Sequence, residues 1–146
     1  MQMAVIFCET SNPTKRFIDR CESPGETARI AAYLAGQSAG QCGPCTFGLP
    51  AIADALAHLA WQGRDERAAE WLRSLLPLVD KRGACHLPDG AVALVASTLR
   101  VFAGHLREHL TRGPCPAASR PPVLPVPRAP ARQPAARVAT RPGSQP

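Results

Sequence analysis

The chain of 146 residues has the length of one ordinary domain, but its C-terminal part does not have the composition of one. Ten of its 16 prolines lie in residues 113–146, together with five arginines and no acidic residue. Those arginines supply most of the formal charge of +6, so the rest of the chain is nearly neutral, which argues against a basic face that binds nucleic acid.

Six cysteines in so short a chain would fit a secreted disulfide framework if a signal peptide accompanied them. The stretch Met1–Cys8 has no basic residue, and its apolar run is too short for a signal sequence. No segment approaches the length of a membrane span. We therefore expect a cytoplasmic protein without direct membrane insertion, in a reducing compartment where clustered thiols bind metal more often than they form disulfides.

The predicted elements begin with a short apolar strand over Ala4–Cys8, which a polar turn follows. The first helix should start at Ser23, because serine suits the N-cap, Pro24 suits the first turn and Glu26 can reach back to the cap amide. This helix should stop near Gly36.

Three more helices are predicted, with short connections between them. Residues 49–60 repeat apolar side chains at helical spacing, and Gly63 should end this helix. Asp65 can cap the next helix, whose apolar stripe covers residues 68–79. The last helix is predicted as one continuous element over residues 88–110, with an acid in its first turn.

The predicted fold class is therefore all-α, a small antiparallel bundle of about four helices over residues 23–112. Residues 1–22 should form a short strand and turn, the remnant of a preceding domain. Residues 113–146 should be a disordered or polyproline-like tail, because a segment rich in Pro, Arg and Ala cannot bury enough surface to offset the entropy of ordering.

Two cysteine-bearing turns connect these helices. Residues 37–48 read Gln-Ser-Ala-Gly-Gln-Cys-Gly-Pro-Cys-Thr-Phe-Gly, and residues 82–88 read Arg-Gly-Ala-Cys-His-Leu-Pro. Cys42 and Cys45 have the spacing to grip one metal ion or cluster just ahead of a helix N-terminus, and Cys85 can add a third sulfur. We expect the three thiols to converge on one metal centre, with Gly40 and Gly43 permitting close backbone approach to the sulfurs.

The thiols leave other chemistries open. Cys42, Cys45, Cys85 and His86 form a Cys3His set that could close a structural zinc site. The segment from Cys42 to Cys45 also spells the Cys-Gly-Pro-Cys of thioredoxin-type thiol–disulfide oxidoreductases, although the strand and βαβ context of that motif are missing. Buried thiols without any metal are the remaining interpretation.

Residues 38–48, followed by Gly83-Ala84-Cys85, resemble the C-terminal iron–sulfur region of the NADH-binding flavoprotein subunit of respiratory NADH-quinone oxidoreductase and of related hydrogenases and formate dehydrogenases. The resemblance spans roughly Ala4–Arg112. It implies that Cys42, Cys45 and Cys85 are ligands of a [4Fe-4S] cluster in a helical bundle, which passes single electrons between a flavin and a further acceptor.

The sequence departs from that family's turn, because Ala39 stands at the position of its first cysteine. Three matching thiols imply a [4Fe-4S] cluster whose fourth iron takes another ligand, or a [3Fe-4S] cluster. Candidate fourth ligands are Cys115, then His86, then Cys21. Residues 1–23 do not resemble the family's FMN- and NADH-binding region, so we expect no complete active site in this chain and a flavoprotein or other redox subunit as its partner.

Other chemistry-bearing residues are assigned to the fold. His105-Leu-Arg-Glu-His109 matches the His-x-x-Glu-His of inverted zinc peptidases, but no acidic residue follows it, so the pattern favours a solvated polar helix face. His58 should lie at the surface or the boundary of the core. Trp61 and Trp71 should pack in the bundle core.

Overall fold

The computed structural model describes residues 23–119, 121, 122, 124, 125 and 127. These residues form five α-helices and no strand, which confirms the predicted all-α class. The predicted strand Ala4–Cys8, the rest of residues 1–22 and most of the predicted tail lie outside the described residues. The elements are α2 (Ser23–Gln37), the π-helix η2 (Pro44–Gly48), α3 (Leu49–Trp61), α4 (Glu66–Val79), α5 (Leu87–Val101), α6 (Ala103–Arg112) and the 3-10 helix η3 (Pro116–Ser119).

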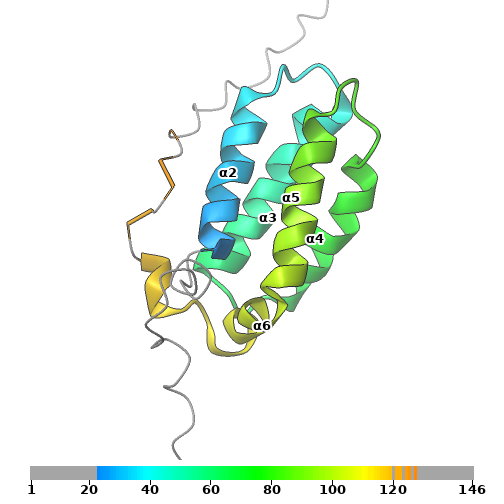
Figure 1. Ribbon diagram of the computed structural model, residues 1–146. Coiled ribbons are helices and arrows are strands. Elements are labelled where there is room, and N and C mark those ends of the chain that lie inside the picture. The colour runs from blue at the N-terminus through cyan, green and yellow to red at the C-terminus, as the bar shows by residue number, and fades with distance from the viewer. Residues whose placement is uncertain (1–22, 120, 123, 126, 128–146) are drawn as a thin grey trace, which may run out of the picture.

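Helices α2 to α5 lie side by side and alternate in direction, and α6 crosses one end of the bundle (Figure 1). The connections 38–48 and 80–86 both lie at the other end (Figure 1). We call that end, which carries the two cysteine turns, the cysteine end. The opposite end, formed by the turn 62–65, α6 and residues 113–119, is the histidine end.

The predicted helix over residues 88–110 is two helices, α5 and α6, bent by 74°. Phe102 leaves helical geometry with φ −102° and ψ 23°, although its N–H still donates to Thr98 O at 2.9 Å. The break turns α6 across the bundle, where it buries Leu106 and His109 against the other helices. No single described helix is long and apolar enough to cross a membrane, and α5 with α6 passes that test only as a bent pair.

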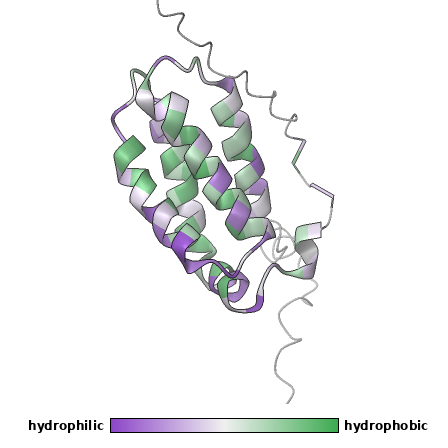
Figure 2. Cartoon of the chain, turned by 180° about the vertical axis from the view of Figure 1, so that it is seen from behind, coloured by the Kyte–Doolittle hydropathy of each residue, from purple (hydrophilic) through white to green (hydrophobic). Residues whose placement is uncertain are grey.

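The core lies between α3, α4 and α5, and apolar residues run along these packed helices (Figure 2). Each fully buried large aliphatic side chain contributes about 1.5–3 kcal/mol of hydrophobic stabilisation. Helix α2 packs on this core mainly through small residues, Ala28 and Ala31, which allow a close approach to α3. The most deeply buried large aliphatic side chains are Leu49, Ile52, Leu56, Leu72 and Val95.

Polar contacts fix the helix ends and one interface. The predicted cap is confirmed, because the Asp65 side chain accepts a hydrogen bond from Ala68 N at 3.0 Å at the start of α4. Thr27 on α2 and Thr98 on α5 share a buried hydroxyl–hydroxyl hydrogen bond of 3.0 Å. These bonds therefore set the beginning of α4 and the register of α2 against α5.

The prediction that both tryptophans pack in the core is wrong. Trp61 is 43% exposed and Trp71 is 55% exposed. On α4 the inward positions are taken by Leu72 and its helical neighbours, so Trp71 falls beside the stripe and lines a shallow depression of about 400 Å³ between α3 and α4. His58 lies at the boundary of the core, as expected, with Nε2 3.1 Å from Asp65 Oδ2.

The described start of the predicted tail has defined structure. After α6 the chain forms η3 and then passes α2, where Leu124 N donates to Glu26 Oε2 at 3.3 Å. Arg29 Nη1 donates to Leu124 O at 3.2 Å. These described residues therefore add backbone to the side of α2.

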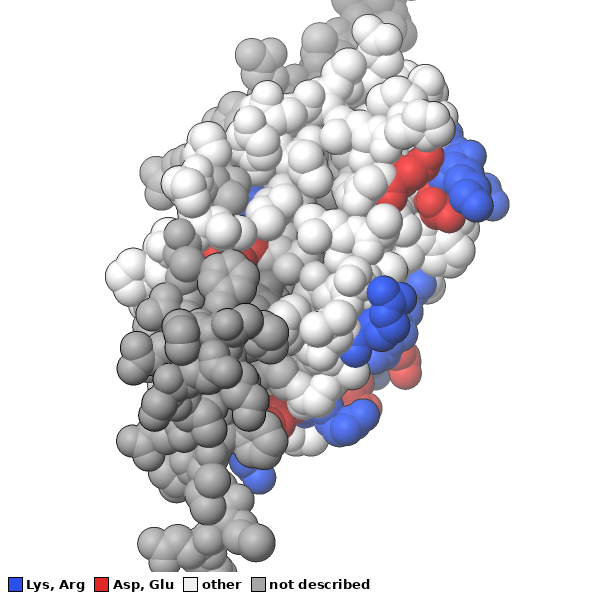
Figure 3. All heavy atoms as spheres, viewed as in Figure 1, with Lys and Arg blue, Asp and Glu red and all other residues white. Residues whose placement is uncertain are grey.

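The charged residues do not form a single basic surface on the face drawn in Figure 3. Lys and Arg side chains alternate there with Asp and Glu along the edge formed by α4, and the surface over α2 and α5 carries few charges (Figure 3).

Candidate metal centre at the cysteine end

The first cysteine turn is held by its own backbone and by one hydroxyl. Gly40 has φ +64°, a conformation that favours glycine and lets the chain reverse after α2. Thr46 Oγ1 donates to Gly40 O at 2.8 Å, and Thr46 N donates to Cys42 O at 2.9 Å. The π-helix η2 then leads directly into α3, and short π segments of this kind are frequent at functional sites.

The three cysteines differ in how much of each is exposed to solvent. Cys45, inside η2, is only 5% exposed and packs in the hydrophobic core. Cys42 is half-buried beside it, and Cys85 in the second turn is exposed. None of the described cysteines forms a disulfide.

One close contact brings the two cysteine turns near each other, and another folds the second turn back on itself. A Cβ placed on Gly48 would overlap Val79 Cγ2, so the start of α3 can approach the end of α4 only with glycine there. A Cβ on Gly83 would lie 2.8 Å from Pro88 Cγ and 2.9 Å from Cys85 O. A Cβ on Gly40 or Gly43 would meet nothing within 4 Å, so among these four glycines the close contacts within the chain fall on Gly48 and Gly83.

The two turns meet at the sulfur of Cys42. It accepts hydrogen bonds from the backbone N–H groups of Ala84 and Cys45, and these bonds lower the pKa of Cys42. The pKa of Cys45 is raised to about 11, first by burial and then by its hydrogen bond with Cys42 and by the charges of Cys42 and Cys85. The structure thus brings Cys42, Cys45 and Cys85 within electrostatic reach of one another.

The candidate fourth ligands are placed elsewhere. His86 has a fully exposed side chain whose Nδ1 lies 3.1 Å from Asp89 Oδ2. Asp89 also accepts a hydrogen bond from Lys81 N at 2.8 Å, so it ties His86 to the loop rather than to the thiols. Cys115 lies in the segment before η3, at the histidine end of the bundle (Figure 1). Cys21 is outside the described residues.

The donor set fits an iron–sulfur cluster at three of its corners. Three thiol groups from two turns can supply three thiolates, and the backbone N–H groups that point at Cys42 suit the negative charge of a thiolate-bound cluster. By their chemistry, three thiolates with one further ligand would also suit zinc. Among the described residues, however, these three thiols are not a group whose ligand atoms all lie within 4.8 Å of one another, so they are spaced more openly than one zinc ion requires.

Comparison with known families distinguishes the cluster from zinc. Residues 26–109 match the family described as the NADH-ubiquinone oxidoreductase-F iron-sulfur binding region. The chain belongs to this family. The matched range contains Cys42, Cys45 and Cys85 and ends before Cys115, and it confirms the resemblance drawn from the cysteine turns. No curated protein and no solved structure matches the chain.

Sequence reasoning missed a second cluster, at the histidine end of this iron–sulfur family member. His109 is 2% exposed, and His105 is half-buried with its ring centroid 4.5 Å from that of His109. Burial lowers the pKa of His105, and the nearby His109 lowers it further while Glu108 opposes the shift. The interpretation of this pattern as a solvated helix face is wrong. The spacing of four residues, with the apolar Leu106 between, was the available signal.

Proposed function

We propose that this chain is an electron-transfer domain that binds an iron–sulfur cluster through Cys42, Cys45 and Cys85. The observation that supports this most is that the backbone N–H of Ala84, in the second cysteine turn, lies close enough to the sulfur of Cys42 to lower the pKa of that thiol. Membership of an iron–sulfur binding family supports the choice of metal. The domain resembles part of an NADH dehydrogenase flavoprotein subunit and performs no bond-making chemistry by itself.

Each thiol has a distinct position relative to solvent. Cys45 anchors the site to the hydrophobic core, where burial excludes water from one side. The backbone N–H groups on Cys42 stabilise negative charge on its sulfur and so tune the reduction potential of whatever is bound there. When bound, the cluster supplies one-electron transfer, and the protein contributes position, burial and hydrogen bonds.

The cluster proposed is [4Fe-4S], with the fourth iron coordinated by a ligand other than Cys42, Cys45 and Cys85. Ala39, at the position of the family's first cysteine, is exposed in the turn before Cys42 and offers no donor. Within the described part of the chain, the thiols that interact at this end are Cys42, Cys45 and Cys85. A three-thiolate site also accommodates [3Fe-4S], which is the alternative form of the same proposal.

The electron partner should approach from the cysteine end. Cys85 is exposed there, and Phe47, two residues after Cys45, is 75% exposed. An apolar side chain beside an exposed ligand is suited to a protein contact, since aromatic residues are enriched in such interfaces. We propose a flavoprotein or another redox subunit as the occupant.

Iron and acid-labile sulfide in anaerobically purified protein test the cluster directly. The wild-type chain should be brown and contain both, whereas Cys42→Ser and Cys85→Ser should lose most of the iron, the sulfide and the visible absorption. Cys115→Ser is the matched control, because it removes a half-buried thiol at the opposite end, and it should keep the colour. Colourless protein with one zinc per chain would refute the cluster and support the structural zinc alternative.

The variant Ala39→Cys tests the number of thiolate ligands. It restores the family's first cysteine at an exposed position of the turn. If three thiolates hold the cluster in the wild type, this variant should change the EPR spectrum toward that of a reduced [4Fe-4S] centre and slow cluster loss in air. Identical spectra and identical loss rates in both proteins would contradict a vacant thiolate position at residue 39.

Thiol–disulfide exchange is a second candidate, and one observation favours it. A lowered pKa for Cys42 beside a raised pKa for Cys45 is the asymmetry expected of a nucleophilic and a resolving thiol. However, η2 and the helices around it take the place of the strand that precedes such motifs. Turnover of a model disulfide by metal-free protein, abolished by Cys42→Ser and unaffected by Cys85→Ser, would favour this function over electron transfer.

A further inference from the structure

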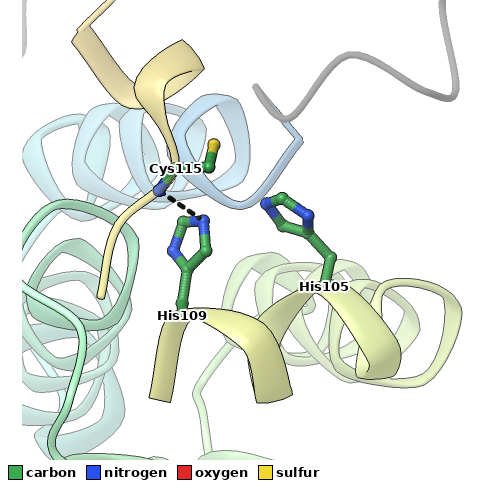
Figure 4. A group of neighbouring side chains, drawn as sticks. All are labelled: His105, His109 and Cys115. Carbon is green, nitrogen blue, oxygen red and sulfur yellow. Dashed lines mark hydrogen bonds between the residues drawn. The ribbon is translucent and has the colours of Figure 1, made fainter. Parts of the chain in front are cut away.

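The histidine end brings three potential metal ligands together, away from the cysteine turns. One ligand atom each from His105, His109 and Cys115 lies within 4.8 Å of the other two. Both imidazoles project from the same side of α6 toward the segment that carries Cys115 (Figure 4). We propose that these three side chains form a second metal site, which binds Zn²⁺ independently of the iron–sulfur cluster.

The two histidines are placed by the helix itself. Their spacing of four residues puts them on the same face of α6, one turn apart, with ring centroids 4.5 Å apart and ring planes inclined by 56°. The break at Phe102 turns α6 across the end of the bundle, so this face is directed inward. The pair is therefore packed against the protein and offers a partly enclosed site.

Backbone contacts orient the ring of His109 as in many metal-binding histidines. Its Nδ1 lies 3.3 Å from Leu59 O, to which it can only donate, and so Nε2 is the acceptor. That Nε2 atom faces Cys115 and accepts a hydrogen bond from Cys115 N at 3.3 Å. A carbonyl on one ring nitrogen and a lone pair on the other is the arrangement in which histidine binds zinc. Zinc would replace the bond to Cys115 N.

The turn after α6 brings the thiol to the histidines. Gly113 has φ +92°, which favours glycine, and its N–H donates to His109 O at 2.9 Å. Arg64 N donates to the same carbonyl at 3.0 Å, and Arg64 Nη2 donates to Arg112 O at 2.9 Å. The C-terminus of α6 is therefore fixed before any metal binds, and Cys115 follows it by only three residues.

The donor set selects the class of metal. Two imidazole nitrogens and one thiolate sulfur suit zinc, whereas Mg²⁺ and Ca²⁺ require oxygen ligands. Ligand atoms around tetrahedral zinc are roughly 3.3–3.7 Å apart, so the three groups must close by about 1 Å on binding. The last turn of α3 points the carbonyl of Leu59 here, and the negative end of a helix dipole favours a cation. A water molecule would complete the coordination.

Metal binding at the histidine end is tested in the full chain after the three thiols of the cysteine end have been removed. Cys42→Ser, Cys45→Ala and Cys85→Ser together remove the other three described thiols, and alanine is chosen at the buried position because it keeps the core apolar. This variant should bind one Co²⁺ per chain with thiolate charge-transfer absorption, and Zn²⁺ should displace the Co²⁺. Adding Cys115→Ser should abolish the charge-transfer band.

The histidines are tested by affinity. His105→Gln should weaken Zn²⁺ binding by more than the roughly 10–100-fold that loss of an outer-shell partner costs, as measured by competition with a chromophoric chelator. His58→Gln is the matched control, because that histidine lies on α3 and pairs with Asp65, and it should leave the affinity unchanged. Equal effects of the two substitutions, or no zinc affinity in the parent variant, would overturn the proposal.

The cluster-loaded wild-type chain gives an independent reading if the triple variant folds poorly. Dialysed against Zn²⁺, the wild-type chain should carry one zinc beside its iron, and Cys115→Ser should carry the iron alone. Loss of both metals in Cys115→Ser would mean that Cys115 belongs to the cluster site, and it would overturn a separate zinc site. Iron without zinc in both proteins would overturn the zinc site while leaving the electron-transfer function intact.

Discussion

The cysteine end and the histidine end of the bundle hold their candidate metal ligands in contrasting ways. At the cysteine end the thiols lie in connecting turns and reach the solvent at Cys85. At the histidine end the imidazoles lie on a helix. His109 is almost completely buried there, and its ring donates to Leu59 O and accepts from Cys115 N. An accessible site is suited to exchange with a partner protein, whereas an enclosed site is suited to holding elements together.

Gly63→Ala should have the largest effect of these substitutions, and it should affect the histidine end while leaving the cysteine end nearly unchanged. Gly63 has φ +60°, and a Cβ there would lie 2.7 Å from His109 O. We expect the free energy of unfolding to fall by about 2–4 kcal/mol, since left-handed strain and a backbone overlap combine. Chemical denaturation measures it. The loss should fall on the histidine end, so zinc affinity should drop while the iron content of the folded protein stays near that of the wild type.

The matched control for this change is Gly43→Ala. Gly43 has helical φ and ψ, and a Cβ there meets nothing within 4 Å, so stability should change little. A large loss in Gly43→Ala, or an unchanged stability in Gly63→Ala, would show that the close contact between the turn 62–65 and α6 does not carry the energy assigned to it.

Gly48→Ala should act on the cysteine end. The added methyl overlaps Val79 Cγ2, and overpacking of this kind costs about 1–3 kcal/mol. Because this contact sets the approach of the two cysteine turns, iron incorporation should fall while zinc binding at the histidine end persists. Val79→Ala in the same chain should restore part of the iron content, since it removes the Cγ2 atom that the added methyl group overlaps. No rescue would mean that the turns are brought together by another contact.

The topology of the bundle predicts that the two cysteine turns lie together. It also predicts that Cys115 lies away from them. In an up-and-down bundle the connections after the first and third helices share an end, which puts the turns of Cys42 and Cys85 together. The same rule sends the segment after the last long helix to the opposite end. Cys115 was considered as a fourth ligand on its distance along the chain from Arg112, which takes no account of this rule.

Apolar periodicity predicts the helices, but it predicts neither the break between α5 and α6 nor the burial of the polar side chain of His109. The sequence around Phe102 has no proline and keeps its apolar spacing, so only packing across the bundle end reveals the bend between α5 and α6. The pattern from His105 to His109, with no acidic residue after it, favours a solvated polar helix face. The burial of His109 depends on Leu59 O, a backbone acceptor fifty residues away that no local pattern indicates.

Thiol reactivity should distinguish the two neighbouring cysteines of the metal-free chain. Backbone hydrogen bonds lower the pKa of Cys42, whereas burial raises the pKa of Cys45 to about 11. At pH 7 Cys42 should therefore be alkylated at least roughly tenfold faster, because the thiolate is the reacting form. Pulsed iodoacetamide with peptide mass spectrometry measures both rates. Equal rates would mean that the Ala84 hydrogen bond does not persist without metal.

Acid should weaken both ends slightly, through one carboxylate at each. Hydrogen bonds from Ala68 N, helped by His58, lower the pKa of Asp65 at the histidine end. At the cysteine end, the hydrogen bond with His86 and then that from Lys81 N lower the pKa of Asp89. A carboxylate whose pKa is lower in the folded state stabilises it above the unfolded pKa of about 4, and this stabilisation is lost as the pH falls through the folded value.

The substitutions Asp65→Asn and Asp89→Asn should each flatten the acid limb of the stability curve between about pH 5 and pH 2, as followed by thermal melts. Asp65→Asn should cost little at pH 7, because asparagine also caps helices and can still accept from Ala68 N. Asp89→Asn should instead loosen the loop that carries Cys85, since it weakens the bonds to both Lys81 N and His86. Faster iron loss at pH 7 in the second variant alone would place the sensitivity of the cluster at the cysteine end, whereas equal loss in both would mean that the two ends are coupled.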